Sequence, residues 1–351
     1  MTATQSRQPV IKCDSVYKIF GDNVGAFLRN GRVDVAAAQA AGCIIGVNNA
    51  TFEVYEGEIL VVMGLSGSGK STLLRCISRL TEATAGDIYI DGKDLRAMNS
   101  ENLIELRRSK MGMVFQSFAL LPHKTVLENI AFPLQVKGQS TEDSIKRALA
   151  MAELVGLQGR ENYFPRQLSG GQQQRVGIAR SLAVEPDIWF LDEPFSALDP
   201  LIRREMQDEF LRLQGVLGKT ILFITHDFDE ALRLADRIAI MKDGVIEQID
   251  TPANIILHPP TEYVEKFTNE VPREKVLVCE NVMEAIDTVP ADAFGTIKVE
   301  KEAIIESVAE EVLNEEKPVA VVDKNRRIVG VLRSKTIIHI LFGKKNSAPS
   351  D

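Results

Sequence analysis

The chain has 351 residues and is 45% hydrophobic, which is enough for one large domain and a smaller one, each with its own core. Its 49 Asp and Glu residues outnumber its 41 Lys and Arg residues, and the formal net charge of −8 argues against nucleic acid as a partner. The cysteines lack the paired spacing of a zinc site or a disulfide framework and suit buried cytosolic thiols: Cys13, Cys43, Cys76 and Cys279.

Residues 22–46 separate an early strand from Val47 and include the helix-prone run from Val35 to Ala41, which Gly42 follows. This segment predicts an added helix. Further along the chain, strand-like apolar runs alternate with helical patterns, and these runs are 59–63, 188–191, 220–224 and 237–241. Such alternation predicts an α/β domain with a largely parallel core sheet.

A glycine-rich loop with the sequence Gly-Leu-Ser-Gly-Ser-Gly-Lys-Ser follows the run 59–63 and precedes a helix predicted from Thr72 to about Leu80. Glycines let successive N–H groups face one anion, and the helix N-terminus adds partial positive charge. Lys70 then reaches the β- and γ-phosphates, and Ser71 binds Mg²⁺. The alternative is a turn that merely joins a strand to a helix, but the combination of strand, loop and helix is specific. We therefore predict a nucleoside triphosphate site formed by Gly64, Ser66, Gly67, Ser68, Gly69, Lys70, Ser71 and Thr72.

The pattern becomes mostly helical over residues 98–165. Within residues 141–155, for example, apolar side chains recur at the spacing of one helix face. This stretch interrupts the alternation of strands and helices. We expect it to form a helical subdomain inserted into the α/β core.

A second glycine-containing loop, Leu-Ser-Gly-Gly-Gln, precedes a helix predicted over 173–183. Ser169 is a good N-cap, and Gly170 and Gly171 let a phosphate approach the first helical turn closely. Taken alone, the loop favours a simple helix cap, because Ser-Gly-Gly is common in loops. The functional interpretation is a second anion site that ends at Gln172.

Two carboxylates, Asp192 and Glu193, end the apolar run 188–191. Burying two adjacent acids beside a core strand is costly without a cation or polar partners. Ligands of open α/β sheets bind at the carboxyl ends of strands, so we expect Asp192 to hold Mg²⁺, directly or through water, and Glu193 to polarise the attacking water. An acidic surface turn, the alternative, does not need four apolar residues before it. His226 follows the strand predicted over 220–225, at the same sheet edge as Glu193.

A different module begins near residue 275, after a proline-containing break at 251–260. Apolar strands are predicted over 318–323 and 327–332, and Ser334 is expected to cap a helix that reaches Leu341. A strand near 295–299 and a helix over 302–313 precede them. Residues 343–351 are polar and expected to be disordered.

Six of these features, in this order, resemble the nucleotide-binding subunit of ATP-binding cassette (ABC) transporters. They are the phosphate loop, Gln116 after an apolar run, the loop 168–172, Asp192-Glu193, the sequence Ser-Ala-Leu-Asp at 196–199, and His226. The resemblance covers residues 10–249 and assigns residues 1–268 to the cassette. It implies a P-loop ATPase with a RecA-like core, an antiparallel β edge and a helical subdomain, with ATP and Mg²⁺ as cofactors.

The resemblance also implies a homodimer in which two chains pack head to tail. Each ATP then lies between the phosphate loop of one chain and the 168–172 loop of the other, where the contacts come from Ser169, Gly170, Gly171 and Gln172. Asp199 couples the two sites. Hydrolysis removes the γ-phosphate contact that holds the dimer closed.

By resemblance, four residues carry the hydrolysis: Glu193 as base, His226 on the γ-phosphate, Gln116 as sensor of Mg²⁺ and the attacking water, and Lys70 on the phosphates. The metal ligands implied are Ser71, Gln116 and Asp192. An aromatic ring is expected against adenine; Phe20 fits this position best, and Tyr17 is the alternative.

The insertion 22–46 resembles the importer branch that takes up quaternary amines such as choline, glycine betaine, proline betaine and carnitine. Residues 275–342 are similar to one cystathionine-β-synthase (CBS) motif, a module that commonly occurs as tandem pairs and gates related importers in response to ionic strength. The alternative is a tail that only packs against the cassette. A single copy followed by two adjacent lysines departs from that pattern and makes regulation by salt doubtful.

Together these features predict the ATPase subunit of a binding-protein-dependent importer at the cytoplasmic face of the inner membrane. No apolar run is long enough to span a bilayer, so permease subunits and an extracytoplasmic binding protein are the expected partners. An importer of polar amino acids or polyamines is the nearest alternative. A non-transport ABC ATPase and a nucleotide-sensing regulator are disfavoured, the first by the acidic balance and the second by the intact Glu193 and His226.

Overall fold

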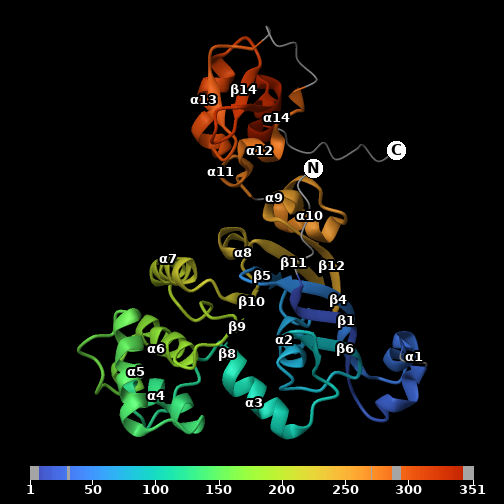
Figure 1. Cartoon of the computed structure of the whole chain (residues 1–351). Coiled ribbons are helices and arrows are strands. Elements are labelled where there is room, and N and C mark those ends of the chain that lie inside the picture. Colours follow the sequence, from blue (N-terminus) through green and yellow to red (C-terminus); the bar gives the residue numbers. More distant parts are fainter. Residues whose placement is uncertain (1–7, 30–31, 270, 287–293, 343–351) are drawn as a thin grey trace. The chain divides into compact units, whose positions relative to one another are not determined.

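The computed structural model describes residues 8–29, 32–269, 271–286 and 294–342. The chain divides into two compact units, Met1–Asp250 and Thr251–Asp351 (Figure 1). The boundary expected after residue 268 is therefore wrong. Helices α9 (Pro252–Leu257) and α10 (Glu262–Thr268) belong to the second unit, and apolar side chains of α9 pack on its core. The tail expected over 343–351 lies outside the described residues.

A six-stranded sheet, ordered β12-β11-β5-β10-β9-β8, forms the centre of the first unit. Its strands are β5 (Ile59–Met63), β8 (Met111–Val114), β9 (Ile188–Asp192), β10 (Thr220–Thr225), β11 (Arg237–Lys242) and β12 (Val245–Asp250). All neighbours pair in parallel except β11 and β12. Every residue of β5, β9 and β10 is buried, as in parallel sheets covered on both faces. The predicted parallel core is confirmed.

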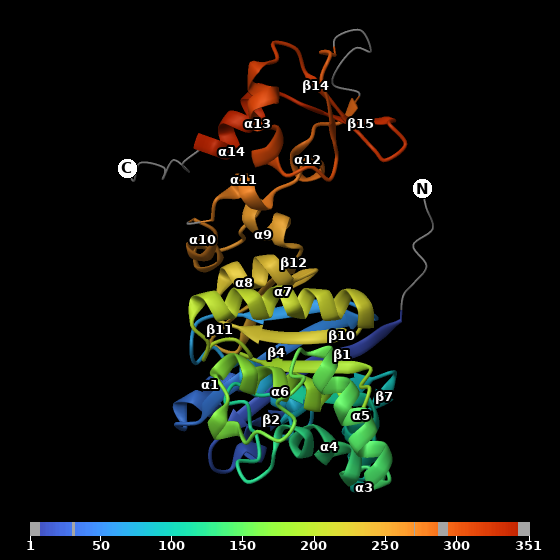
Figure 2. The same ribbon diagram turned by 90° about the vertical axis from the view of Figure 1, so that its left-hand side faces the viewer.

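Four helices of the first unit accompany this sheet: α2 (Lys70–Ile77), α3 (Ser100–Lys110), α7 (Pro200–Leu217) and α8 (Phe228–Leu234). The apolar side chains of α2 share one core with this central sheet and with the antiparallel sheet described below. Helix α7 lies along β10 (Figure 2), where the Phe210 and Phe223 rings are 5.9 Å apart between centroids. This aromatic packing holds the middle of α7 against the sheet.

The predicted antiparallel edge is a four-stranded sheet ordered β4-β1-β6-β7. Its strands are β1 (Pro9–Phe20), β4 (Ile44–Tyr55), β6 (Ala85–Ile90) and β7 (Lys93–Asp94). The insertion between β1 and β4 contains the 3-10 helix η1 (Val24–Phe27), β2 (Leu28–Arg29), β3 (Arg32–Val33) and α1 (Val35–Ala40). Asp34 caps α1 by accepting the Ala37 N–H at 3.0 Å, and Ala38 packs on the end of β1. The insertion thus contains the helix expected there.

The helical subdomain does not match residues 98–165. Strand β8 and the adjoining α3 lie within that range, but β8 belongs to the central sheet. The helices that pack together are instead α4 (Val126–Val136), α5 (Thr141–Leu154) and α6 (Gly170–Leu182), which lie side by side in Figure 1. A 3-10 turn, η2 (Pro165–Gln167), precedes α6. Apolar periodicity identified the helices but not the short strand, because β8 has only four residues.

The second unit contains a three-stranded sheet ordered β13-β14-β15 with helices around it. Its further elements are α11 (Arg273–Val276), α12 (Cys279–Val282), β13 (Lys298–Glu300), α13 (Ile305–Asn314), β14 (Val319–Val322), β15 (Ile328–Leu332) and α14 (Ser334–Phe342). Ser334 does not cap α14 as expected. It is the first residue of that helix, and its hydroxyl donates to the Val312 carbonyl at 2.9 Å, which ties α14 to α13. Among the described residues, no helix is both long and apolar enough to cross a bilayer.

Candidate functional site

The central sheet brings four loops to one edge. Strands β5, β8, β9 and β10 run parallel, so the residues after each of them meet at their carboxyl ends. The glycine-rich loop follows β5, Gln116 follows β8, Glu193 follows β9 and His226 follows β10. Residues of all four loops line one cavity of about 650 Å³.

The glycine-rich loop has a backbone that only glycine can adopt without strain. Gly64 has φ 153°, and a Cβ there would lie 2.1 Å from the Met241 carbonyl oxygen. Gly69, the N-cap of α2, has φ 104°, and its Cβ would lie 2.0 Å from the Gly46 carbonyl oxygen. Two backbone segments therefore approach the loop so closely that a side chain at either position would displace them.

Lys70 is buried beneath this loop. Its ammonium donates to the Gly64 carbonyl at 2.8 Å and to the Leu65 carbonyl at 3.0 Å. Burial lowers the pKa of Lys70, whereas the nearby Glu193 and Asp192 carboxylates act in the opposite direction. A phosphate bound in the loop adds negative charge beside the ammonium and so favours its protonated form.

The loop also contains an unpaired polar atom that suits a phosphate ligand. The Ser68 hydroxyl oxygen is buried and has no hydrogen-bond partner among the described residues. A buried hydroxyl without a partner is costly. Ser68 does not itself line the cavity, but its neighbours Gly67 and Gly69 do, so a phosphate oxygen bound in the loop is the acceptor that this hydroxyl suits. The residues present therefore fit a bound triphosphate.

Two of the three metal ligands that the resemblance implies, Ser71 and Asp192, contact each other. Asp192 is 6% exposed at the end of β9, and its Oδ1 accepts the Ser71 hydroxyl proton at 2.7 Å. Among the described residues, no group of three His, Cys, Asp or Glu side chains could hold a metal by itself. Mg²⁺ commonly takes one or two protein oxygens together with water and substrate phosphates, so Ser71 and Asp192 fit that ion.

Glu193 lies at the centre of the polar groups around the cavity. Its Oε2 is 3.0 Å from His226 Nδ1 and 3.4 Å from Gln116 Nε2. Its φ of 46° is left-handed, and its N–H donates to the Ile224 carbonyl at 3.0 Å. A non-glycine residue in this conformation is strained, and such strain persists where the surroundings hold it. The structure thus brings together three of the four residues that were expected to carry the hydrolysis, and the fourth, Lys70, lines the same cavity.

Phe20 ends β1 and is 42% exposed at the mouth of the cavity. A Cβ on Gly46 would lie 2.9 Å from the Phe20 ring and 2.9 Å from the Thr72 methyl group. The glycine therefore leaves the space that the Phe20 ring occupies. The ammonium of Lys18 is 5.0 Å from the ring centroid. Tyr17, the alternative, is 8% exposed and does not line the cavity.

The second glycine-containing loop forms the N-terminus of the thirteen-residue helix α6. The Ser169 hydroxyl accepts the Gln172 N–H at 3.3 Å, and the Gln172 side chain accepts the Ser169 N–H at 3.1 Å. A Cβ on Gly171 would lie 2.6 Å from the Ile202 side chain of α7, whose N-cap is Asp199. Residues 169–172 do not line the nucleotide cavity of their own chain.

Comparison with known proteins agrees with this geometry. The family model described as ABC transporter matches residues 47–196. The trimethylamine N-oxide transport system ATP-binding protein TmoW of Pelagibacter ubique is 71% identical over 339 residues, which cover 96% of this chain and 98% of that protein. The chain belongs to the ABC transporter family.

Further matches lie in the same branch of this family. The glycine betaine transport ATP-binding protein OpuAA of Bacillus subtilis is 53% identical over 285 residues, which are 80% of this chain and 68% of that protein. A solved dimeric ATP-binding cassette in a post-hydrolysis state, bound to ADP and phosphate, superposes with a TM-score of 0.59. The two sequences are 36% identical, and the match covers 69% of this chain and 98% of the solved one. The ABC ATPase fold, the ATPase activity and the expected importer branch are thereby confirmed.

The ABC cassette also contains site residues that sequence reasoning missed. Ile44 and Leu65 line the nucleotide cavity although they are 70% and 58% exposed. Ile44 pairs with Phe20 across β1 and β4, so both lie at the same end of that sheet. The signal available in the sequence was the apolar pair Ile44-Ile45 directly before Gly46, but its position opposite Phe20 depends on the register of the two strands.

We expect Phe20→Ala to weaken ATP binding, because stacking of a base on an aromatic ring contributes about 1–3 kcal/mol. The Kd for ATP should then rise by about fivefold to 150-fold. Fluorescence titration of the purified cassette with a labelled ATP measures this, and Phe20→Trp is the control that keeps a ring. An unchanged Kd in Phe20→Ala would show that adenine binds elsewhere.

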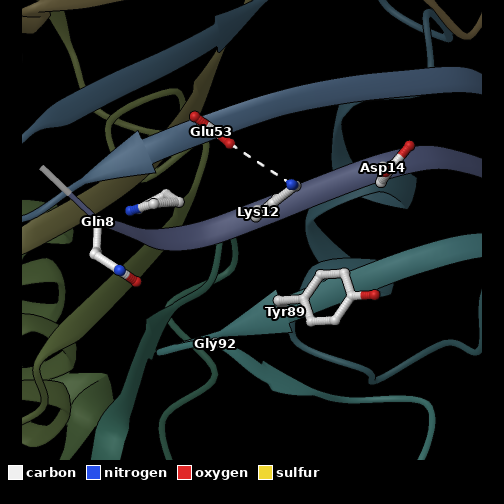
Figure 3. A pocket seen from close by; sticks show the side chains of 7 residues that line it. Gln8, Lys12, Asp14, Glu53, Tyr89 and Gly92 are labelled. Carbon is white, nitrogen blue, oxygen red and sulfur yellow. Dashed lines mark ion pairs between the residues drawn. The ribbon is translucent and has the colours of Figure 1, made fainter. Parts of the chain in front are cut away.

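A second hollow of about 430 Å³ lies on the antiparallel sheet (Figure 3). Lys12 and Glu53 form an ion pair there at 3.9 Å between neighbouring strands. Nearby acids, chiefly Asp87, raise the pKa of the exposed Tyr89 phenol. The charged side chains that line the hollow are partly exposed and of both signs. The hollow therefore lacks the buried polar groups that fix a ligand in a binding site.

Proposed function

We propose that the chain is the ATP-hydrolysing subunit of an importer for trimethylamine N-oxide or a closely related quaternary ammonium solute. The observation that supports hydrolysis is the position of Glu193, held in a strained conformation between His226 and Gln116. The transported solute does not contact this chain; a permease and an extracytoplasmic binding protein recognise it. The chain works at the cytoplasmic face of the inner membrane.

The solute is proposed from the relatives. TmoW, whose name specifies trimethylamine N-oxide, matches nearly the whole chain, whereas OpuAA, named for glycine betaine, matches 80% of it. Choline and betaine were the solutes expected from the sequence. All of these solutes carry a methylated nitrogen. The importer branch is therefore the one expected from the sequence, but the solute favoured within it is trimethylamine N-oxide instead of choline or betaine.

The catalytic unit is a head-to-tail homodimer with two ATP molecules. Each ATP–Mg²⁺ binds to Phe20, the glycine-rich loop and Asp192 of one chain, and the N-terminus of α6 from the other chain covers its γ-phosphate. The position of residues 169–172 outside their own nucleotide cavity supports this arrangement. Lys70, Ser68 and Ser71 would hold the phosphates and Mg²⁺, and the bound ion would supply positive charge against the charge that develops during hydrolysis.

The permease is proposed to dock on an apolar groove of about 390 Å³ between the central sheet and the helical subdomain. Met113 of β8 and Phe132 and Val136 of α4 line this groove, and the latter two are 39% and 44% exposed. Gln116 lies two residues after β8, so a helix seated in the groove would lie close to the loop that contacts Glu193.

The function is tested by reconstituting the chain with its permease and binding protein in liposomes and measuring uptake of labelled solutes. We expect ATP-dependent, saturable uptake of trimethylamine N-oxide, with weaker or no uptake of choline. Uptake of a polar amino acid or a polyamine in place of methylated amines would overturn the proposed solute. ATP hydrolysis without uptake of any solute would overturn the transport role.

The C-terminal unit is proposed to be a single CBS-like module that pairs with the same module of the second protomer. The order β13, α13, β14, β15, α14 supports this assignment. Because the described residues contain a single copy, we expect a chain truncated after Asp250 to respond to osmolality like the full chain. Uptake measured over a range of osmolalities tests this expectation, and a response lost on truncation would instead assign a sensing role to the module.

A further inference from the structure

Two ion pairs join helix α7 to helix α8. Arg203, in the first turn of α7, lies 3.2 Å from Asp227, the N-cap of α8. Arg233, in the last turn of α8, pairs with Asp208 further along α7. The two pairs connect the same helices, but only the first is adjacent in sequence to residues of the nucleotide site.

Arg203 bridges two of these site loops. One terminal nitrogen donates to Asp227 Oδ2 at 3.2 Å, and the other donates to the Leu198 carbonyl at 3.2 Å. Leu198 immediately precedes Asp199, and Asp227 immediately follows His226. The guanidinium therefore connects the backbone of the Asp199 loop with the residue next to His226.

Asp227 transmits this contact to His226 because both ends of its own backbone are held. Its N–H donates to the Thr225 hydroxyl at 3.0 Å and its carbonyl accepts the Ala231 N–H at 3.2 Å, while Oδ1 accepts the Glu230 N–H at 3.1 Å. His226 directly precedes Asp227, and its Nδ1 is 3.0 Å from Glu193. A shift of the Asp227 carboxylate would therefore move the imidazole relative to Glu193.

We infer that Arg203 is a positioning residue, which holds His226 against Glu193 and makes that geometry depend on the Asp199 loop. The inference rests on the proposed hydrolysis at Glu193. Arg203 does not line the nucleotide cavity, so ATP binding does not depend on it. Small displacements of catalytic groups lower the rate of the chemical step steeply, so the effect belongs in kcat and not in KM.

The test compares Arg203→Met with Arg233→Met in the full chain, by steady-state ATP hydrolysis and thermal unfolding. Both variants lose one ion pair between α7 and α8, so both should lower Tm to a similar extent. We expect Arg203→Met to lower kcat by about tenfold with KM for ATP within about twofold of wild type, and Arg233→Met to leave kcat within about twofold. Arg203→Lys, which keeps a cation near Asp227, should recover most of the lost kcat.

A second variant separates the loss of the His226 geometry from a general loss of stability. Asp227→Asn keeps an N-cap acceptor for α8 but removes the charge that Arg203 pairs with. It should lower kcat like Arg203→Met, and the double variant should fall no further, because both changes break one interaction. Wild-type kcat in Arg203→Met, or an equal loss in Arg233→Met, would overturn the inference. Failure of the proposed function is recognised separately, as absent hydrolysis in the wild-type chain.

Discussion

Glu193→Gln should abolish most ATP hydrolysis while ATP still binds. The amide preserves the volume of the side chain and its hydrogen bond with His226, but it cannot accept a proton from the attacking water. Removal of a general base lowers the rate by about 10²- to 10⁴-fold. The variant should therefore hold ATP and accumulate as a dimer, which phosphate release and size-exclusion chromatography in ATP–Mg²⁺ would detect.

A matched control exists elsewhere in the same unit. Glu185 is also a carboxylate in the left-handed conformation, with φ 54°, but its side chain is 69% exposed and pairs with Arg147 at 2.7 Å. Glu185→Gln removes the same charge from a comparable backbone and should leave turnover within about twofold, since surface ion pairs contribute little. Wild-type turnover in Glu193→Gln would show that another group activates the water.

Four of the six strands of the central sheet could be predicted almost to the residue, and the reason is local. Strands β5, β9 and β10 are continuous apolar runs, so burial on both faces was encoded in each segment separately. The same holds for the glycine-rich loop, in which Gly64 and Gly69 adopt conformations that only glycine tolerates. Elements whose structure follows from one short segment could therefore be predicted from the sequence alone.

Features that depend on partners distant in sequence could not be predicted. The boundary near residue 250 depends on which core α9 packs against, and the role of Ser334 depends on the carbonyl of Val312, which is 22 residues away. The pairing of Arg203 with Asp227 likewise joins residues 24 apart. An arginine in the first turn of a helix ordinarily indicates a solvated surface, and only the fold shows which loops it connects.

Ser169→Arg should also abolish hydrolysis, but for a different reason. A large cation at the start of α6 would fill the space through which the partner's γ-phosphate reaches this helix in the proposed dimer. Loss of the cap destabilises α6 by about 1 kcal/mol, and Ser169→Ala shares that loss without the added bulk. We therefore expect Ser169→Arg to keep the monomer's affinity for ATP, to lower turnover by about a hundredfold or more, and to lose ATP-dependent dimerisation.

Mixing the two inactive variants tests whether the site is shared between chains. In a head-to-tail dimer of Glu193→Gln with Ser169→Arg, one site combines the intact Glu193 of the second variant with the intact Ser169 of the first, and the other site carries both defects. Random pairing makes about half of the dimers mixed, so equal amounts combined before ATP is added should recover up to about a quarter of wild-type turnover. If each chain instead completes its own site, every site in the mixture contains a defect and no activity returns. Recovery on mixing therefore requires that the N-terminus of α6 serves the nucleotide of the opposite chain.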